Sequence, residues 1–326
     1  MKSEILRLLK ESDDYISGQQ MCDRFHVSRT AVWKAIEQLK KEGYEIEAVR
    51  NRGYRLLESP DIMSEAEIRS LMDTEWVGKN IVYFDEIDST NNRAKELGEK
   101  DGVHGTLFVA DRQVAGKGRR GRVWESPKGI SIYMTILLRP DLIPTKAPML
   151  TLVMAQSVAE GIREVTGMET GIKWPNDIVM NKKKVCGILT EMSTEIDYIN
   201  YVVIGVGINV NQKVFDEELK EKATSLMIET GAPVKRSALI AAVMKHFEIN
   251  YALFMENGDL SGLQESYNEM LVNRGKEVRI LEPGNEYNAH AYGINETGEL
   301  IVRTQKGEEK HVFAGEVSVR GIYGYV

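Results

Sequence analysis

The 326-residue sequence has few cysteines, few prolines and no apolar run of membrane-spanning length. Its two cysteines, Cys22 and Cys186, have no paired spacing, which argues against a disulfide framework and favours a reducing compartment. The most apolar segment, residues 201–210, is too short to cross a bilayer and contains two glycines. Charges interrupt the apolar residues of 1–14, so we expect no signal peptide. These absences predict a cytoplasmic protein with no membrane partner.

Several short catalytic motifs are also missing. The G-x-x-x-x-G-K-[ST] spacing of a P-loop and the G-x-S-x-G elbow of a hydrolase do not occur. The five histidines are scattered and match no zinc-ligand spacing, so we expect no structural metal. The net charge of −7 excludes a protein whose whole surface is basic and binds nucleic acid, but it is compatible with a local DNA-binding surface.

Residues 1–60 have the pattern of a small separate domain. Ser17 is a suitable N-cap for one short helix, and Ser28, after a turn at His26-Val27, is a suitable N-cap for the next. In the second helix, apolar residues at 32, 36 and 39 fall on one face. Alternating residues at 44–49 and 54–57 then predict two strands joined by the basic turn 50–53. We interpret this order as a winged helix-turn-helix.

The polar face of the second helix and the basic turn supply the side chains expected in a DNA groove. Residues 1–58 hold 11 Lys and Arg against 10 Asp and Glu, a net charge of +1, whereas the remainder carries −8. A helical protein-docking module is the alternative to a DNA-binding domain. The predicted DNA-contacting residues are Ser28, Arg29, Thr30, Trp33, Lys34, Arg50, Asn51 and Arg52.

The rest of the chain predicts two further domains, which makes the fold class α+β multidomain. A linker at 58–61 precedes residues 61–271, where strand-like and helical patterns alternate as in a mixed α/β core. Helices are expected through 238–254 and 263–271. From 272 to 326, short alternating strands separated by glycine turns predict a small C-terminal SH3-like β-barrel.

Polar clusters interrupt the apolar strands of the core, and α/β sheets place their sites at strand ends. The basic loop AGKGRRGR, residues 115–122, suits either an anion site or a solvated loop when it is taken alone. The other clusters are DSTN at 88–91, KWPND at 173–177, KVCGIL at 184–189 and GVGIN at 205–209. Lys184 begins a strand and can point into a pocket, whereas Asn181-Lys182-Lys183 is most simply a solvated hairpin turn. GVGIN does not open a helix, so it is a poor dinucleotide site.

In this order, the clusters together resemble the biotin–protein ligase family, and the full length is similar to its bifunctional members, the biotin operon repressors. The resemblance implies that biotin and ATP, with Mg²⁺ carried by ATP, form biotinyl-5′-AMP. Biotin is then transferred to a lysine of the biotin carboxyl carrier domain of acetyl-CoA carboxylase or a similar biotin-dependent carboxylase. The resemblance also implies binding to operator DNA, biotin-dependent repression and a ligand-promoted homodimer.

The resemblance assigns site residues by motif. Lys184 and Arg119 are the expected catalytic residues, because fixed cations offset the repulsion between a carboxylate and a phosphate. The family loop commonly has arginine at the position of Lys117, and lysine lacks the planar fork for a bidentate contact. The expected biotin- and ATP-binding residues are Ser89, Thr90, Asn91, Gln113, Gly116, Lys117, Gly118, Arg119, Arg120, Arg122, Lys173, Asn176, Lys184, Gly187 and Asn209.

Two alternatives stay open at this point. One is a ligand-sensing repressor that binds the same ligand without catalysis. The other is a ligase for a different acid, since lipoate ligases share the core architecture of the family. The presence of Lys184, Arg119 and the KWPND turn argues against the repressor without catalysis, and the N-terminal DNA-binding pattern and the particular loop sequences favour biotin over lipoate.

Overall fold

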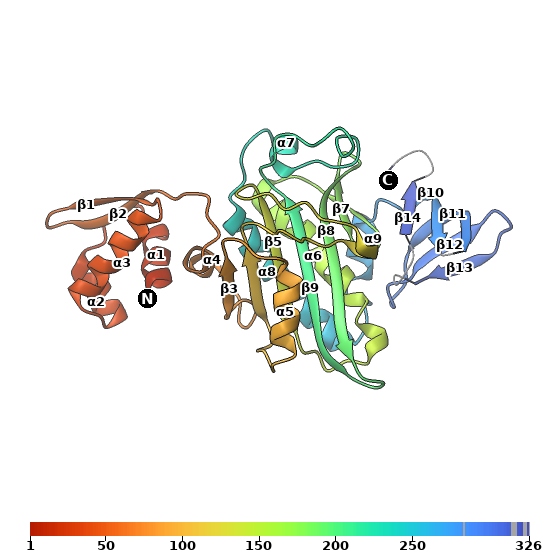
Figure 1. Ribbon diagram of the computed structural model, residues 1–326, viewed down its shortest axis with the longest axis horizontal. Coiled ribbons are helices and arrows are strands. Elements are labelled where there is room, and N and C mark those ends of the chain that lie inside the picture. The colour runs from red at the N-terminus through yellow and green to blue at the C-terminus, as the bar shows by residue number, and fades with distance from the viewer. Residues whose placement is uncertain (283, 314–317, 322–324, 326) are drawn as a thin grey trace. The chain divides into compact units, whose positions relative to one another are not determined.

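The computed structural model describes residues 1–282, 284–313, 318–321 and 325, and the chain divides into two compact units, Met1–Met72 and Asp73–Val326 (Figure 1). The division lies C-terminal to the linker expected at 58–61. The elements of the first unit are α1 Lys2–Lys10, α2 Gly18–Phe25, α3 Arg29–Lys41, β1 Glu45–Val49, β2 Gly53–Glu58 and α4 Glu65–Leu71.

The first unit has the predicted winged helix-turn-helix, and its local signals act as expected. Ser17 begins α2 with a capping box, in which its side chain accepts from the backbone of Gln20 and the Gln20 side chain accepts in return. His26 ends α2 in the left-handed conformation at φ 53°, and the Ser28 side chain then caps α3. These caps set the turn between the two helices.

Helix α4 packs with this unit through polar contacts to α1. The Arg7 guanidinium donates to the backbone carbonyls of Arg69, Ser70 and Met72, which are orphan acceptors at the end of α4. Lys10 forms a 2.6 Å ion pair with Glu67, and both side chains are largely buried. The segment that follows the winged helix is therefore held against it.

The second unit is built on a seven-stranded sheet of order β3-β4-β5-β9-β8-β7-β6. β3 and β4 are parallel, and every other neighbouring pair is antiparallel. In Figure 1, α5 covers one face of the sheet, while α6 and α8 lie on the other. The strands are β3 Ile81–Phe84, β4 Thr106–Ala110, β5 Ser131–Leu138, β6 Gly171–Lys173, β7 Asp177–Met180, β8 Lys183–Thr194 and β9 Ile199–Asn209. The helices are α5 Thr90–Gly98, α6 Met149–Thr166, α7 Leu226–Thr230, α8 Arg236–Asn257 and α9 Gln264–Met270, with 3-10 turns at Arg119–Gly121 and Pro144–Lys146.

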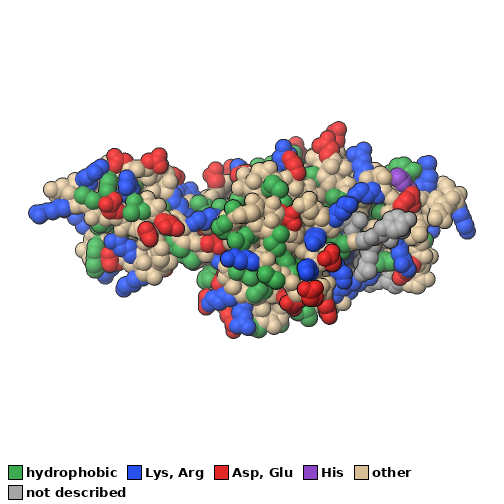
Figure 2. Space-filling view, turned by 90° about the horizontal axis from the view of Figure 1, so that it is seen from above, with side chains coloured by type: hydrophobic (Ala, Val, Ile, Leu, Met, Phe, Trp, Pro, Cys, Tyr) green, Lys and Arg blue, Asp and Glu red, His purple; other side chains and the backbone are tan. Residues whose placement is uncertain are grey.

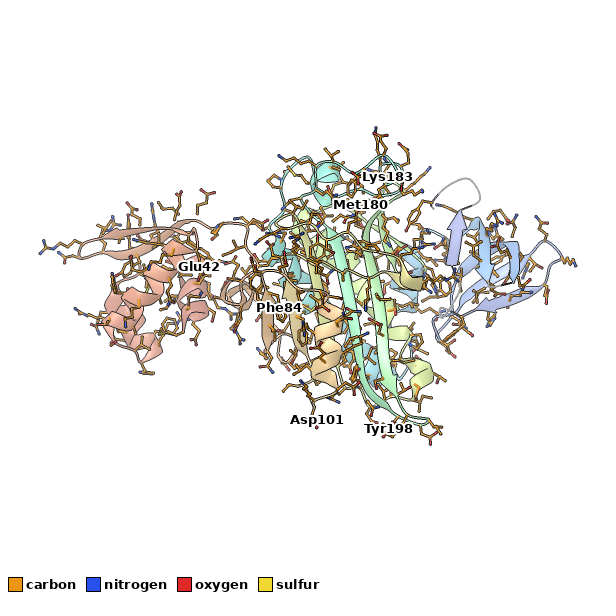
Figure 3. All side chains as sticks on the ribbon, in the orientation of Figure 1. Glu42, Phe84, Asp101, Met180, Lys183 and Tyr198 are labelled. Carbon is orange, nitrogen blue, oxygen red and sulfur yellow. The ribbon has the colours of Figure 1, made fainter. Side chains whose placement is uncertain are left out.

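The two ends of this sheet differ in what they carry. Met180 and Lys183 flank the short turn between β7 and β8 at one end, and Asp101 and Tyr198 lie at the opposite end (Figure 3). The β7–β8 turn has Asn181 and Lys182 at positive φ, as the predicted solvated hairpin turn requires. Lysine and arginine side chains are interspersed with acidic ones over the face drawn in Figure 2.

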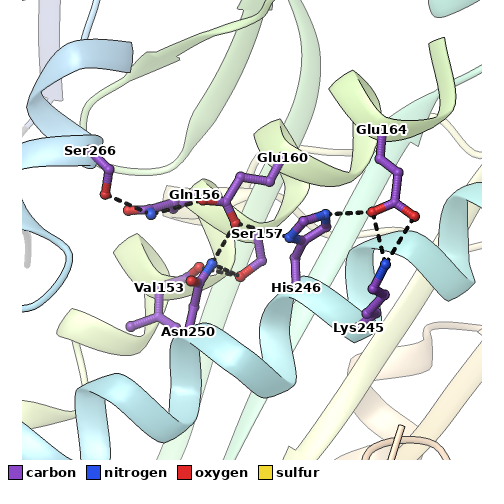
Figure 4. Close-up of polar contacts among 9 residues, drawn as sticks. All are labelled: Val153, Gln156, Ser157, Glu160, Glu164, Lys245, His246, Asn250 and Ser266. Carbon is purple, nitrogen blue, oxygen red and sulfur yellow. Dashed lines mark hydrogen bonds and ion pairs between the residues drawn. The ribbon is translucent and has the colours of Figure 1, made fainter. Parts of the chain in front are cut away.

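Helices α6 and α8 pack closely around a polar network (Figure 4). A Cβ at Gly161 would lie 2.9 Å from the backbone of Val243, so glycine permits the close approach. Asn250 donates to Ser157 and Glu160 at 3.0 and 2.7 Å, which satisfies polar groups buried between the helices. Helix α8 is long and apolar enough to cross a membrane, but 56% of its most apolar window is buried within the protein. Its packing is that of a core helix.

The C-terminal strands form a second antiparallel sheet, as predicted, with the order β13-β12-β11-β10-β14. Its closure into an SH3-like barrel stays a prediction, because the last segments of the chain fall partly outside the described residues. The strands are β10 Lys276–Glu282, β11 Asn285–Ile294, β12 Leu300–Thr304, β13 Glu309–Val312 and β14 Ser318–Gly321.

A buried ion pair joins α8 to the end of β4, and we predict that it carries much more stability than an exposed one. The Arg236 guanidinium lies 2.7 Å from Asp111, with side-chain exposures of 3% and 12%. Asp111→Ala removes the carboxylate beside a buried cation, so the free energy of unfolding should fall by about 3 kcal/mol. The measurement is urea unfolding. The matched control is Asp85→Ala, because Asp85 pairs with Lys128 at 2.6 Å on the surface. Equal losses in the two variants would contradict the prediction.

Candidate active site

One pocket on the sheet of the second unit brings together residues from most of the polar clusters. It opens on the face that α5 covers, where β8 and β9 pair, and the basic loop between β4 and β5 forms one wall. Its lining residues are Ser89, Thr90, Asn91, Gln113, Lys117, Gly118, Arg119, Trp124, Asn176, Lys184, Gly187, Ile188, Leu189, Gly205, Val206 and Gly207. Residues that are far apart in the sequence therefore form one concave surface.

The DSTN cluster begins α5, but not with the side-chain cap that serine at this position suggests. Ser89 occupies the N-cap position with extended backbone and makes no capping hydrogen bond. Gln113 acts instead, since its Oε1 accepts from the backbone N of Thr90 at 2.9 Å and from its hydroxyl at 3.1 Å. The Gln113 amide nitrogen in turn donates to Ser126 at 3.1 Å. The start of the helix is thus tied to Gln113, in the segment that follows β4.

Asn91 is held in a buried network that fixes its orientation. Its Oδ1 accepts from Thr135 at 2.6 Å, and its Nδ2 donates to Glu191 at 2.8 Å. Burial alone would raise the pKa of Glu191, but hydrogen bonds from Lys95 and Asn91 outweigh it and lower that pKa. A Cβ at Gly205 would lie 2.1 Å from the Asn91 oxygen, so the side chain rests directly on the strand.

Trp124 forms the apolar wall of the pocket and was missed as a site residue by the sequence analysis. A Cβ at Gly207 would lie 2.6 Å from its indole, and one at Gly187 would lie 3.0 Å from it. The glycines of GVGIN therefore make room for Asn91 and Trp124 on one face of β9. The indole nitrogen of Trp124 is buried and has no hydrogen-bond partner among the described residues. The period-two spacing of Gly205 and Gly207 was the available signal for such a close approach.

The basic loop has an ordered hairpin-like base. Lys117 and Val123 form an antiparallel bridge, and the Gly118 amide donates to the Arg122 carbonyl at 2.7 Å. A Cβ at Gly116 would lie 2.3 Å from the Trp124 carbonyl, so this position requires glycine. The spacing of Gly116, Gly118 and Gly121 also fits G-x-G-x-x-G, but the loop leads into a 3-10 turn and then β5. It therefore lacks the helix N-terminus of a dinucleotide site.

The pocket is lined by three cations, of which Lys117 and Arg119 come from the basic loop and Lys184 from β8. Lys117 donates to Asn92 at 2.9 Å, and Arg119 donates to the side-chain oxygen of Asn176 at 2.9 Å. The Asn176 amide donates to the Ile188 carbonyl at 3.0 Å, which anchors this pair to β8. Burial lowers the pKa of Arg119 from its usual range, although the group remains a cation at neutral pH. Lys117 thus lies against the start of α5, whereas Arg119 lies against Asn176, directly before β7.

Lys184 is the third cation, and a carboxylate holds it. Its Nζ lies 2.5 Å from Oδ1 of Asp177 and 5.2 Å from the centre of the Trp124 ring. Burial alone would raise the pKa of Asp177, but the Lys184 ammonium and the hydrogen bonds from Lys184 and Tyr325 outweigh it. The pKa of Asp177 is therefore lowered. Asp177 lies in the KWPND motif but was not among the expected site residues.

Some expected site residues lie outside the lining of the pocket. Arg120 and Arg122 are exposed on the loop, and Gly116 supports its base. Buried Lys173 has its Nζ 3.3 Å from the ring centre of Tyr325, and Asn209 donates to the Thr224 carbonyl at 3.1 Å. Within the described part of the chain, no three His, Cys, Asp or Glu side chains form a group that could hold a metal ion.

The expected DNA-contacting residues lie on the surface of the first unit. Arg29, Thr30 and Lys34 are exposed on α3, and Trp33 has 53% of its surface exposed. On the β1–β2 turn, Arg50 and Asn51 are exposed, with Asn51 at φ 64°. Arg52 lies 4.1 Å from the Tyr15 ring centre and 3.3 Å from Asp14. Ser28 is committed to capping α3.

Comparison with known proteins agrees with this arrangement. Residues 83–209 match the Biotin/lipoate A/B protein ligase family, residues 2–55 match an HTH domain, and residues 275–320 match the Biotin protein ligase C terminal domain. The solved biotin protein ligase from Aquifex aeolicus in complex with biotin and ATP is 34% identical, with a TM-score of 0.66. That similarity covers 74% of this chain and 99% of the Aquifex chain. The fold and the site define this class: the chain belongs to the biotin/lipoate A/B protein ligase family.

Within this class, the full-length relatives combine two activities. The chain is 42% identical over 324 residues to "Bifunctional ligase/repressor BirA" of Bacillus subtilis (strain 168), covering 98% of each chain. It is 28% identical over 313 residues to the protein of the same name from Escherichia coli (strain K12), covering 96% of this chain and 95% of that one. The predicted resemblance to bifunctional biotin–protein ligases is confirmed.

The lowered pKa of Asp177 predicts a pH-dependent contribution to stability. A carboxyl group with a lowered folded pKa stabilises the fold above its unfolded pKa, and this stabilisation is lost as pH falls through the folded value. The gap in unfolding free energy between the wild-type protein and Asp177→Asn should therefore narrow as pH falls from about 6 to about 3. Urea unfolding across this range measures the gap.

The control for this series is Asp197→Asn, which alters an exposed carboxylate in the β8–β9 turn. Its unfolding free energy should follow that of the wild-type protein at every pH. A gap for Asp177→Asn that stays constant or widens on acidification would show that the carboxylate does not stabilise the fold in its charged form.

Proposed function

We propose that this chain is an ATP-dependent biotin–protein ligase that also represses transcription in response to biotin. The observation that carries the ligase assignment is a single pocket that is lined by Lys117, Arg119 and Lys184 and has Trp124 as its apolar wall. Ser89, Thr90, Asn91 and Gln113 add uncharged polar groups to the lining. Such a pocket suits a ligand with an apolar body, a neutral polar head and an anionic end.

The cations of the pocket reduce the repulsion between the two anions that react in the first step. The carboxylate of biotin must approach the α-phosphate of ATP, form a new bond to phosphorus and displace pyrophosphate. Two anions repel, and a cation about 4 Å from either one offsets about 4 kcal/mol at an effective dielectric constant of about 20. Lys184 and Arg119 stabilise this charge, while Mg²⁺ enters with ATP and neutralises the departing pyrophosphate.

The neutral residues of the pocket bind the rest of biotin. Ser89, Thr90 and Gln113 offer hydroxyl and amide groups, and the network around Thr135 and Asn91 holds them in place before the ligand arrives. Preorganised donors and acceptors bind a neutral polar ring without reorganisation cost. Asn176 and the loop glycines lie on the side where the adenylate would extend.

Transfer places fewer demands on the protein. The mixed anhydride is already a good electrophile, and a neutral lysine amine from the carrier attacks its carbonyl carbon and displaces AMP. The basic loop lies beside the pocket, so ordering it over the intermediate would exclude water and protect the anhydride. The partner is the biotin carboxyl carrier domain of acetyl-CoA carboxylase or of a similar carboxylase, in the cytoplasm.

The first unit supplies the repressor activity. Helix α3 presents Arg29, Thr30, Trp33 and Lys34 for a major groove, and the β1–β2 turn presents further basic groups as a wing. We propose that bound biotinyl-5′-AMP favours a homodimer whose two copies of α3 engage the two halves of an operator. The three-domain division at residues 60 and 271 belongs to the same proposal.

The pocket assignment predicts that substitution of one of two adjacent lysines lowers ligase activity and that substitution of the other does not. Lys184→Met should lower biotinyl-5′-AMP formation by about 10²- to 10³-fold, because it removes one preorganised charge from the transition state. Lys183→Met should keep activity within about twofold, because the Lys183 Nζ donates to the Lys220 carbonyl outside the pocket. The measurement is transfer of labelled biotin to a purified carrier domain.

Lipoate in a parallel reaction tests the identity of the acid. Transfer of lipoate and not biotin would identify a lipoate ligase, and binding of biotin without transfer would identify a ligand-sensing repressor. Equal activity of the two lysine variants would remove Lys184 from the catalytic site.

The DNA-binding face predicts a charge-specific effect on α3. Lys34→Ala should weaken binding to duplex DNA in the presence of biotin and ATP and reduce the slope of log affinity against log salt by about one, as loss of one phosphate contact requires. Lys41→Ala is the control, because Lys41 is exposed at the far end of the same helix. Fluorescence anisotropy at several salt concentrations measures both.

Sedimentation of the same samples tests the ligand-promoted dimer. Equal dimerisation with and without biotinyl-5′-AMP would exclude the coupling, and equal DNA affinity of the two lysine variants would place the DNA on another surface.

A further inference from the structure

A residue from the end of the chain reaches the edge of the ligase pocket. The hydroxyl of Tyr325 donates to Oδ2 of Asp177 at 2.5 Å. The Nζ of Lys173 lies 3.3 Å from the centre of the Tyr325 ring, a cation–π contact beneath the same side chain. Tyr325 follows the C-terminal sheet by a few residues and is partly buried. It therefore joins the C-terminal region to the KWPND motif.

Asp177 lies between this tyrosine and the proposed catalytic lysine. Tyr325 contacts one carboxylate oxygen, and the Lys184 ammonium contacts the other at 2.5 Å. The Asp177 side chain is only 14% exposed. Its backbone is fixed at the start of β7 by antiparallel pairing with Gly187. With both oxygens engaged, the carboxylate has one orientation, and that orientation sets where Lys184 is held.

Lys184 needs such support because its side chain is long and flexible. A charge stabilises a transition state most when it is already in place, since moving it during the reaction costs reorganisation energy. Gly187 leaves space for the lysine stem, because a Cβ there would lie 2.9 Å from both Cε and Nζ of Lys184. Asp177 supplies the ion pair that holds the ammonium, and Tyr325 donates a hydrogen bond to Asp177.

We propose that Tyr325 is a positioning residue for Lys184, acting through Asp177, in the formation of biotinyl-5′-AMP. This inference rests on the proposed ligase function and adds a residue to it. The C-terminal region thereby contributes to the first reaction without touching the reacting atoms, because Asp177 and Lys184 lie between them and Tyr325. The low pKa of Asp177 fits this arrangement, because the carboxylate must stay charged to hold the ammonium.

The tyrosine has two separable features, and two variants separate them. Tyr325→Phe removes only the hydroxyl that holds Asp177 and keeps the ring against Lys173. Tyr325→Ala removes both. If the hydroxyl is what matters, the phenylalanine variant alone should show most of the effect.

The test measures the two reactions one at a time on the full-length protein. Single-turnover formation of biotinyl-5′-AMP from biotin and α-labelled ATP should be about tenfold slower in Tyr325→Phe. Transfer from added biotinyl-5′-AMP to a carrier domain should stay within about twofold. Adenylation brings two anions together and depends on the placed cation, whereas transfer begins with a neutral amine. Equal slowing of both steps would overturn the proposal.

A double-mutant cycle shows whether the effect passes through Asp177. Adding Tyr325→Phe to Asp177→Asn should cause no further loss of the adenylation rate, because the ion pair to Lys184 through which Tyr325 acts is already lost. Independent, multiplicative losses would overturn the proposal. Tyr292→Phe is the matched control, since Tyr292 is exposed on β11 and away from the pocket, and it should leave both rates unchanged.

The outcomes separate this inference from the function on which it rests. If the wild-type protein forms no biotinyl-5′-AMP, the proposed function fails. If the wild-type protein forms it and Tyr325→Phe forms it at the same rate, only the role of Tyr325 fails. Thermal unfolding of each variant shows whether the fold is intact. If Tyr325→Ala slows adenylation and Tyr325→Phe does not, the effect belongs to the ring, and the role of the hydroxyl is overturned.

Discussion

The ligase pocket depends on close contact between side chains and the bare backbone of the central sheet. Gly205 and Gly207 lie on the same face of β9, and any Cβ there would collide with Asn91 or Trp124. Gly187 on the neighbouring strand leaves similar space for Lys184. The neutral, apolar and cationic parts of the site all rest on these positions. A side chain on any of these glycines would displace one wall of the pocket.

Charge is the second constraint, because an acidic protein must concentrate cations in two places for two different anions. In the pocket, Lys117 and Arg119 come from the basic loop and Lys184 from β8, and Asn92, Asn176 and Asp177 each hold one of them. On α3 and the β1–β2 turn, basic side chains are instead exposed and spread along a surface. Cations gathered around one pocket suit a small ligand, whereas spread and solvated ones suit a phosphate backbone. The two activities of the family are thus built from the same residue types in different settings.

Local signals in the sequence predicted much of the fold. Ser17 and Ser28 cap their helices, the Asn181–Lys182 turn is a solvated hairpin, and the C-terminal strands pair in antiparallel fashion. Ser89, by contrast, occupies the N-cap position of α5 without capping it, because Gln113 from the segment after β4 binds the first turn. Trp124, Asp177 and Tyr325 were missed because their environment comes from distant segments.

The sequence alone determined which chemical groups are present and in which local elements they lie. Caps, turns and alternating strands depend on neighbouring residues, so they are legible without the fold. The tertiary structure decided which of the cations face one pocket, which residue holds each of them, and that Lys173 lies beneath a tyrosine outside the pocket lining. These outcomes depend on strand register and on close approaches between distant segments, such as Asp177 and Tyr325, which are 148 residues apart. Such contacts have no local signature, because a side chain's partners are set by packing in three dimensions.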